Sequence, residues 1–152
     1  MADGPTPRGP PGGRRRDGRT RDGLRLHFVE NVDPTDIIDL LDALDLDRTA
    51  FNVISKSGGT VETMTAFFIA RDRLRARFGD DGYRERVVVT TDPERGSLRP
   101  LAAAEGLPVF DVPPGVGGRF SVFTPVGLYP LAAAGHDVAA FLAVLVDGVE
   151  VA

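Results

Sequence analysis

Six consecutive residues, Ser55-Lys56-Ser57-Gly58-Gly59-Thr60, combine three hydroxyl side chains, one ammonium group and two glycines. Hydroxyl and ammonium groups donate hydrogen bonds to anions, and a glycine lets the backbone approach a ligand closely because it lacks a Cβ. Lys56 is the single lysine of the chain, whose other seventeen basic residues are all arginines. These residue types predict a cradle for a phosphate group. The alternative is a Gly/Ser turn that carries a solvated lysine.

The residues on either side of this stretch predict a strand before it and a helix after it. Residues 50–54 are short, apolar and partly β-branched, as in a buried strand. From Thr60 to about Phe78, apolar residues recur at helical spacing. With Thr60 as N-cap, the free N–H groups of the first helical turn and the helix dipole favour an anion here. The stretch matches neither a Walker A loop nor a G-x-G-x-x-G loop, so nucleotide binding is disfavoured.

Strands and helices alternate along the rest of the sequence. Apolar runs and apolar alternation predict strands at about 24–30, 50–54, 87–90 and 109–112. Helical spacing and cap signals predict helices at about 33–44, 60–78, 96–104, 121–134 and 137–146, with interruptions near Pro125 and Pro130. Such alternation is typical of an α/β domain with a parallel sheet and helices on both faces. In such a sheet, a loop that follows a strand lies at the ligand-binding edge.

Composition divides the chain into a tail at residues 1–23 and a folded part at residues 24–152. The tail is rich in Gly, Pro and Arg and has no apolar residue between Ala2 and Leu24, so it is expected to be disordered. Its six arginines and three aspartates give a net charge of +3, which leaves −7 for the remainder of a chain whose total is −4. An acidic folded part argues against nucleic acid as its partner.

Several classes of site are disfavoured by the residues that the sequence contains. No apolar run is long enough to span a bilayer, so no membrane partner is expected, and the tail lacks the apolar region of a secretory signal. The chain has no cysteine and two separated histidines, His27 and His136. A disulfide framework, a thiol nucleophile and a His/Cys metal site are therefore not expected. We interpret both histidines as structural residues.

Two separated motifs resemble one known family. Ile54-Ser-Lys-Ser-Gly-Gly-Thr-Val-Glu-Thr63 is similar to the phosphosugar loop of the sugar isomerase (SIS) domain in the glucose-6-phosphate isomerase (phosphoglucose isomerase) family. Val116-Gly-Gly-Arg-Phe-Ser-Val-Phe-Thr-Pro-Val-Gly-Leu128 is similar to that family's Gly-Gly-Arg-Phe/Tyr-Ser segment, and the resemblance runs from about residue 24 to about residue 143. It implies a flavodoxin-like SIS domain. The domain is expected to lack its first strand, because the Gly/Pro/Arg-rich tail occupies that place.

The resemblance implies an aldose–ketose isomerase that interconverts glucose 6-phosphate and fructose 6-phosphate in cytoplasmic glycolysis and gluconeogenesis, without a cofactor. It carries Ser55, Lys56, Ser57 and Thr60 over as residues that bind the substrate phosphate. It carries Arg119 over as the catalytic residue that stabilises the enediolate. The family's glutamate base, its ring-opening histidine and a further lysine lie downstream of the matched segments, in sequence that this chain does not contain. The resemblance therefore implies a fragment that binds a hexose phosphate and is inactive alone.

Alternatives stay open for two residues and for the whole chain. Glu62 and Asp92 are candidates to line the site, although the helix dipole and a turn explain them at least as well. The chain is a truncated isomerase, a non-catalytic SIS module that senses a sugar phosphate, or an interaction remnant without a ligand, and we favour the first. The assemblies to consider are a homodimer and complementation by a missing C-terminal segment.

Overall fold

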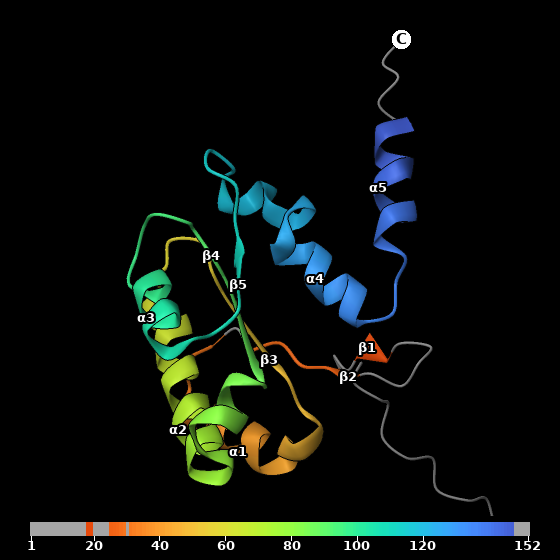
Figure 1. Cartoon of the computed structure of the whole chain (residues 1–152). Helices are drawn as coiled ribbons and strands as arrows, with labels where there is room; N and C mark the ends of the chain where they lie inside the picture. Colours follow the sequence, from red (N-terminus) through yellow and green to blue (C-terminus); the bar gives the residue numbers. More distant parts are fainter. Residues whose placement is uncertain (1–17, 20–24, 30, 148–152) are drawn as a thin grey trace, which may run out of the picture.

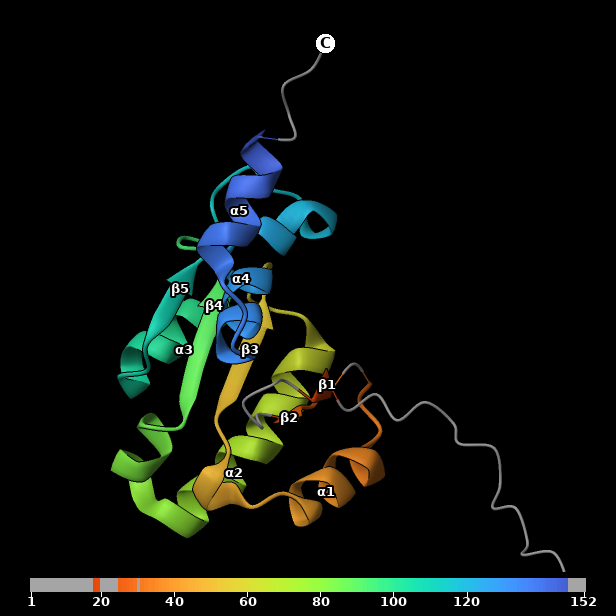
Figure 2. The ribbon, with the colours of Figure 1, turned by 90° about the vertical axis from the view of Figure 1, so that its right-hand side faces the viewer.

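A computed structural model describes residues 18–19, 25–29 and 31–147. In this part of the chain, three parallel strands form a sheet that carries helices on both faces (Figures 1 and 2). The strands are β3 (Phe51–Ser55), β4 (Val87–Thr91) and β5 (Val109–Asp111), in that spatial order. Phe51 lies opposite Val87 and Ser55 lies opposite Thr91, so β3 and β4 end at the same level. The predicted α/β fold class is confirmed.

Helices connect the strands in the way that parallel pairing requires. Helix α2 links β3 to β4, and α3 links β4 to β5. Figure 2 shows α4 on the opposite side of the sheet from these two helices. The bounds are α1 (Pro34–Ala43), α2 (Val61–Arg84), α3 (Leu98–Glu105), α4 (Pro125–Ala133) and α5 (Val138–Asp147), with 3₁₀ helices η1 (Leu46–Arg48) and η2 (Gly118–Phe123). None of the helices described is long and apolar enough to cross a membrane.

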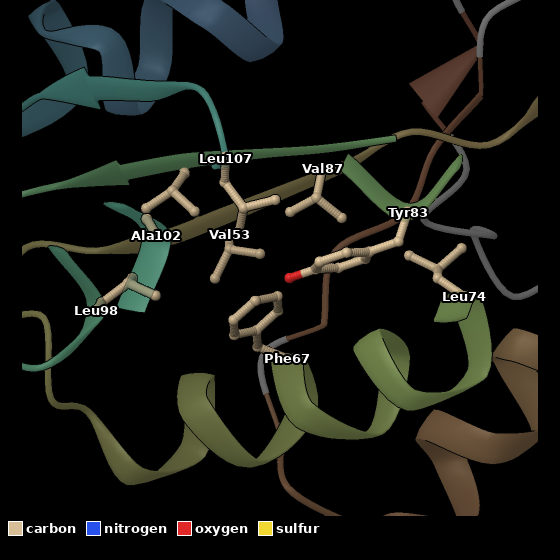
Figure 3. Close-up of a cluster of buried hydrophobic side chains, with 9 residues drawn as sticks. Val53, Phe67, Leu74, Tyr83, Val87, Leu98, Ala102 and Leu107 are labelled. Carbon is tan, nitrogen blue, oxygen red and sulfur yellow. The ribbon is translucent and has the colours of Figure 1, made fainter. Parts of the chain in front are cut away.

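The main hydrophobic core lies between the sheet and helices α2 and α3 (Figure 3). Successive side chains of a strand point to opposite faces, so one alternate set from each strand enters this layer. Full burial of one such aliphatic or aromatic side chain stabilises the fold by about 1.5–3 kcal/mol. The layer therefore fixes the direction of β3 and α2, which together hold the Ser55 to Thr60 loop. Its buried members are Val53, Phe67, Leu74, Tyr83, Val87, Val89, Leu98, Ala102 and Leu107.

A second, smaller core joins α1 to the outer side of α2. Ile37 and Leu41 of α1 are buried there with Leu46 and Ala70. Helix α1 begins as its sequence predicts, because the Asp33 side chain accepts a hydrogen bond of 2.9 Å from the backbone N–H of Thr35, and Pro34 occupies the first helical position.

Two predicted helices differ from their observed bounds for identifiable reasons. The helix predicted at 60–78 continues to Arg84, with a kink at Gly79, where φ is 69° and ψ is −174°. Residues 121–134 were expected to be helical with an interruption near Pro125, and the chain forms the 3₁₀ helix η2 up to Phe123 and starts α4 at Pro125, so that interruption is confirmed. The Thr124 side chain accepts from Val126 N at 3.3 Å, which caps α4 and separates the two helices.

The strand predicted at 24–30 is wrong in extent and in its place in the parallel sheet. Among the described residues 25–29, only β2 (Arg25–Leu26) is a strand, and it pairs antiparallel with β1 (Gly18–Arg19) rather than with the parallel sheet. Phe28 is 66% exposed and Val29 is 49% exposed, so the apolar alternation of this segment has no sheet to pack on. The short strand β1 falls in the tail that was predicted to be disordered. The other residues of that tail lie outside the described residues.

Candidate functional site

The Ser55 to Thr60 loop lies at the carboxyl edge of the sheet, between the end of β3 and the start of α2. Its three hydroxyl groups meet there. Thr60 Oγ1 lies 3.1 Å from Ser55 Oγ and 3.1 Å from Ser57 Oγ, both within hydrogen-bond distance. The structure thus brings together three of the four residues predicted to bind phosphate, as a chain of rotatable O–H groups.

The amino-terminal end of α2 faces this hydroxyl cluster. Thr60 is the N-cap residue, as predicted, and its carbonyl oxygen accepts from Met64 N at 2.9 Å. Its side chain, however, caps no backbone N–H group of the helix. The first N–H groups of a helix have no intrahelical acceptor, and the dipole places about half a positive charge there. This end of the helix is therefore favourable for an anion.

A second loop, residues 92–97, supports the first from the neighbouring strand. Gly58 O accepts hydrogen bonds from Ser97 N at 2.9 Å, Leu98 N at 2.9 Å and Ser97 Oγ at 3.0 Å. The backbones of the two loops can approach each other closely because the residues at the contact, Gly58 and Gly96, have no Cβ. A Cβ on Gly58, whose φ is +66°, would lie 2.9 Å from Arg95 O, and a Cβ on Gly96, whose φ is +83°, would lie 2.6 Å from Gly58 Cα.

The ends of β3 and β4 are tied together beneath these loops. Thr91 Oγ1 donates to Ser55 O at 2.7 Å, and Asp92 N donates to Lys56 O at 3.3 Å. Sequence reasoning missed the contributions of Thr91, Gly96 and Ser97. The available signal was the pair Gly96-Ser97 directly before α3. Loops that follow neighbouring parallel strands lie at the same edge of a sheet, so this pair lies near the first loop.

The positions of Asp92 and Glu62 are explained by a turn and by the helix dipole, respectively. Asp92 Oδ1 accepts from Glu94 N at 2.9 Å and from Arg95 N at 3.0 Å, which closes a turn. The bond from Glu94 N lowers the pKa of Asp92, and the bond from Arg95 N and the positive charges of Arg95 and Lys56 act in the same direction. Glu62 is exposed in the first turn of α2, where the dipole stabilises a carboxylate.

The two predicted cations are placed differently. Lys56 is half-buried within the loop itself, whereas Arg119 is exposed on η2 and follows Gly117 and Gly118. Figure 2 shows η2 at the end of the sheet to which the strand arrows point. Within the part of the chain that the structure describes, no hydrogen bond or ion pair links the Arg119 side chain to the Ser55 to Thr60 loop.

A cleft opens beside the hydroxyl cluster. It has a volume of about 390 Å³ and is lined by Val29, Asn31, Thr60, Glu62 and Thr63. Small-molecule sites typically occupy about 300–1,000 Å³. The cleft is therefore of a size to hold the remainder of a small ligand whose anionic group contacts Thr60.

The fold defines a class, the α/β domains with a parallel sheet flanked by helices, and here a loop rich in hydroxyl groups and glycine lies at the carboxyl edge of that sheet. Residues 15–150 match the family described as Phosphoglucose isomerase, and the chain belongs to that family. The glucose-6-phosphate isomerase of Rubrobacter xylanophilus is 53% identical over 123 residues, which are 81% of this chain and 28% of that protein. A glucose-6-phosphate isomerase of Thermus thermophilus is 48% identical over 120 residues, 79% of this chain and 29% of that protein.

Solved structures agree with the sequence comparison. A hypothetical protein from Thermus thermophilus superimposes with a TM-score of 0.78 at 46% identity, over 82% of this chain and 30% of its own. A glucose-6-phosphate isomerase from Chlamydia trachomatis gives a TM-score of 0.60 at 29% identity, over 69% of this chain and 19% of its own. The chain thus spans somewhat more than a quarter of the length of the curated relatives.

Proposed function

We propose that the Ser55 to Thr60 loop binds the phosphate group of a hexose phosphate. The observation that carries this proposal is the cluster of Ser55, Ser57 and Thr60 hydroxyls at an α2 amino terminus whose N-cap side chain caps no N–H group. A phosphate bound there accepts hydrogen bonds from the hydroxyls and from the backbone N–H groups of the helix. The Lys56 ammonium adds a counter-charge.

We further propose that the chain is the sugar-phosphate-binding part of a cytoplasmic glucose-6-phosphate isomerase, which interconverts glucose 6-phosphate and fructose 6-phosphate in glycolysis and gluconeogenesis. Family membership and the relatives' names support this assignment. Arg119 is the group that we assign to stabilising the enediolate, because a guanidinium exposed after two glycines is free to reach a developing oxyanion.

Turnover is proposed to need more than this chain. The chain aligns with about 28% of the Rubrobacter relative. Glu62 is exposed and Asp92 is engaged by two backbone N–H groups, so neither is positioned as a general base. We assign the proton transfer to groups from a homodimer partner or from a complementing segment.

Calorimetric titration with glucose 6-phosphate and with inorganic phosphate tests the binding proposal. Thr60→Val keeps the side-chain volume and removes the hydroxyl that both serines contact. Loss of a hydrogen bond to a charged group costs about 1.5–3 kcal/mol, so we expect binding to weaken about ten- to hundredfold. Thr60→Ser keeps the hydroxyl and should bind like the parent chain.

Thr35→Val, on the exposed start of α1, is the matched control and should leave the affinity unchanged. Circular dichroism verifies that each variant is folded. Equal phosphate affinity for the parent chain and Thr60→Val would show that the anion binds elsewhere.

A further inference from the structure

The carbonyl oxygen of Gly58 caps the amino terminus of helix α3. It accepts hydrogen bonds from Ser97 N and Leu98 N, both at 2.9 Å, and from Ser97 Oγ at 3.0 Å. A serine at an N-cap position usually accepts a hydrogen bond from an N–H group of its own helix. Ser97 is the N-cap of α3, yet its hydroxyl caps no N–H group of α3 and donates to Gly58 O instead. The side chain of Ser97 is therefore committed to the neighbouring loop.

The same contacts fix the direction of the next N–H group in that loop. The peptide bond between Gly58 and Gly59 is trans, so the C=O of Gly58 and the N–H of Gly59 lie in one plane and point in opposite directions. The N–H of Gly59 therefore points away from α3. It points toward Ser57 Oγ, which lies 3.4 Å from Gly59 N. Ser57 Oγ belongs to the hydroxyl cluster, so this peptide group has α3 on one side and the candidate anion site on the other.

Two more carbonyl oxygens of the loop are held on the side of β4. Ser55 O accepts from Thr91 Oγ1 at 2.7 Å, and Lys56 O accepts from Asp92 N at 3.3 Å. A carbonyl oxygen carries partial negative charge and repels an anion. Residues 91–98 thus bind three carbonyl oxygens of the loop and keep them away from the hydroxyl cluster.

Helix α3 is placed to polarise the peptide group between Gly58 and Gly59. A helix carries about half a positive charge at its amino terminus. A peptide group whose oxygen lies at that terminus is aligned head to tail with the peptide groups of the helix, and its N–H becomes the positive end of the row. Groups in such a row strengthen one another by about 10–30% per hydrogen bond. The core holds α3 in place, because Leu98 and Ala102 are fully buried (Figure 3).

We infer that Ser97 is a positioning residue of the phosphate site and that the peptide group between Gly58 and Gly59 transmits the charge of the α3 amino terminus to the bound anion. Ser97 holds the carbonyl oxygen on one side of this peptide group, and the N–H on the other side donates to the phosphate. Two helices then favour the anion, α2 directly and α3 through one peptide group. This inference rests on the proposed function, because it adds a residue to the same site.

Calorimetric titration of Ser97→Ala with inorganic phosphate and with glucose 6-phosphate tests the inference. The substitution removes one hydrogen bond to Gly58 O and changes no residue of the Ser55 to Thr60 loop. A neutral hydrogen bond changes an equilibrium constant by about three- to tenfold, so we expect binding to weaken by that factor. Ser97→Thr keeps the hydroxyl and should restore the parent affinity, since the exposed position leaves room for a methyl group.

Thr49→Val is the matched control. Thr49 Oγ1 also donates to a backbone carbonyl oxygen, Asp45 O at 2.6 Å, but Thr49 lies at the opposite end of β3 from the loop. Its loss should leave the affinity for phosphate unchanged. Circular dichroism verifies that each variant is folded.

Backbone NMR of the ¹³C,¹⁵N-labelled chain separates positioning from a merely structural role. Without phosphate, Ser97→Ala should shift the carbonyl ¹³C signal of Gly58 and the amide ¹⁵N signal of Gly59, because both atoms belong to the peptide group that loses a hydrogen bond. Ser97→Thr should leave both signals in place. In the parent chain, added phosphate should shift the amide signals of Ser97 and Leu98 with the same Kd as the signal of Gly59, although they lie on the far side of the peptide group.

The outcomes distinguish this inference from the proposed function. Equal phosphate affinity for Ser97→Ala and the parent chain, with weaker binding by Thr60→Val, would overturn the inference and leave the phosphate proposal intact. Weaker binding that Ser97→Thr does not restore would overturn it as well. So would unshifted Ser97 and Leu98 signals at saturating phosphate, a measurement that needs no variant. Equal binding by Thr60→Val and the parent chain would remove the phosphate site, and this inference with it.

Discussion

At the scale of single residues, the candidate site depends on glycines as much as on hydroxyls. Gly58 and Gly96 allow two loops to meet backbone to backbone, and Ser97 then donates to Gly58 O. The hydroxyl cluster of Ser55, Ser57 and Thr60 was predictable because it lies within six consecutive residues. The contribution of Ser97 was not predictable from local pattern, since its partner is 39 positions away and only the parallel pairing of β3 and β4 brings them together.

Replacing Gly96 by alanine should destabilise the protein by more than the cost of holding an alanine at a positive φ. The left-handed conformation costs an L-residue about 1–2 kcal/mol, and the added Cβ would overlap Ser57 O and Gly58 Cα, for about 1–3 kcal/mol more. Gly115→Ala is the matched control, because Gly115 has a φ of +85° and nothing within 4 Å of its Cβ position.

Urea unfolding monitored by circular dichroism measures both variants. We expect Gly96→Ala to lose more free energy of unfolding than Gly115→Ala and to bind phosphate more weakly. Equal losses of unfolding free energy in the two variants would mean that the 92–97 loop shifts to accommodate the added Cβ without disturbing the Ser55 to Thr60 loop.

At the scale of elements, the local sequence pattern predicted whether a segment is a helix or a strand better than it predicted which strands pair. The start of α2 and the strands at 50–54 and 87–90 were predicted closely, because capping residues and continuous apolar runs are local signals. The segment at 24–30 has strand-like alternation, yet among its described residues only Arg25–Leu26 form a strand, and this strand pairs outside the parallel sheet. Alternation shows that a segment can be extended, but it does not show which strand lies beside it.

A buried polar group ties α2 to α3. Tyr83 is fully buried, and its hydroxyl donates to Glu105 Oε2 at 2.7 Å. Arg71 Nη1 and Arg75 Nη1 lie 3.3 and 3.4 Å from Glu105 Oε1, which keeps this carboxylate paired. Burial raises the pKa of Tyr83 above its ordinary value, and the hydrogen bond to Glu105 and the charge of Glu105 act in the same direction.

This pKa shift predicts a loss of stability in alkaline solution. The folded state keeps the phenol proton at pH values where the unfolded chain, with a tyrosine pKa of about 10, releases it. The contribution is complete below about pH 10 and is lost as the pH rises toward the folded pKa. Tyr83→Phe removes the titrating group and the hydrogen bond.

We therefore expect Tyr83→Phe to lower the free energy of unfolding at pH 7 by about 1.5–3 kcal/mol and to flatten its decline between about pH 9.5 and 11. Denaturant unfolding across this pH range measures both effects. Tyr129→Phe, at the other tyrosine, is the control. An unchanged alkaline slope in Tyr83→Phe would contradict the raised pKa of Tyr83.

At the scale of the whole molecule, the purified chain should bind a hexose phosphate without isomerising it at a rate typical of an isomerase. General acid–base catalysis contributes about 10²–10⁴-fold, and no described carboxylate beside the loop is placed as a base. A coupled assay for conversion of fructose 6-phosphate measures turnover. Robust turnover that is lost in Arg119→Ala would contradict this expectation and make Glu62 and Asp92 the first candidates for the base.

The most direct test of the central claim is a residue-resolved titration of the ¹⁵N-labelled chain with fructose 6-phosphate, and separately with fructose. If the Ser55 to Thr60 loop binds the phosphate group, the amide signals of Ser57, Gly58, Gly59 and Val61 shift saturably with the phosphorylated sugar. They do not shift with fructose at the same concentration. Saturable shifts confined to other parts of the chain, or equal shifts with both sugars, would contradict the claim that this loop is a phosphate site.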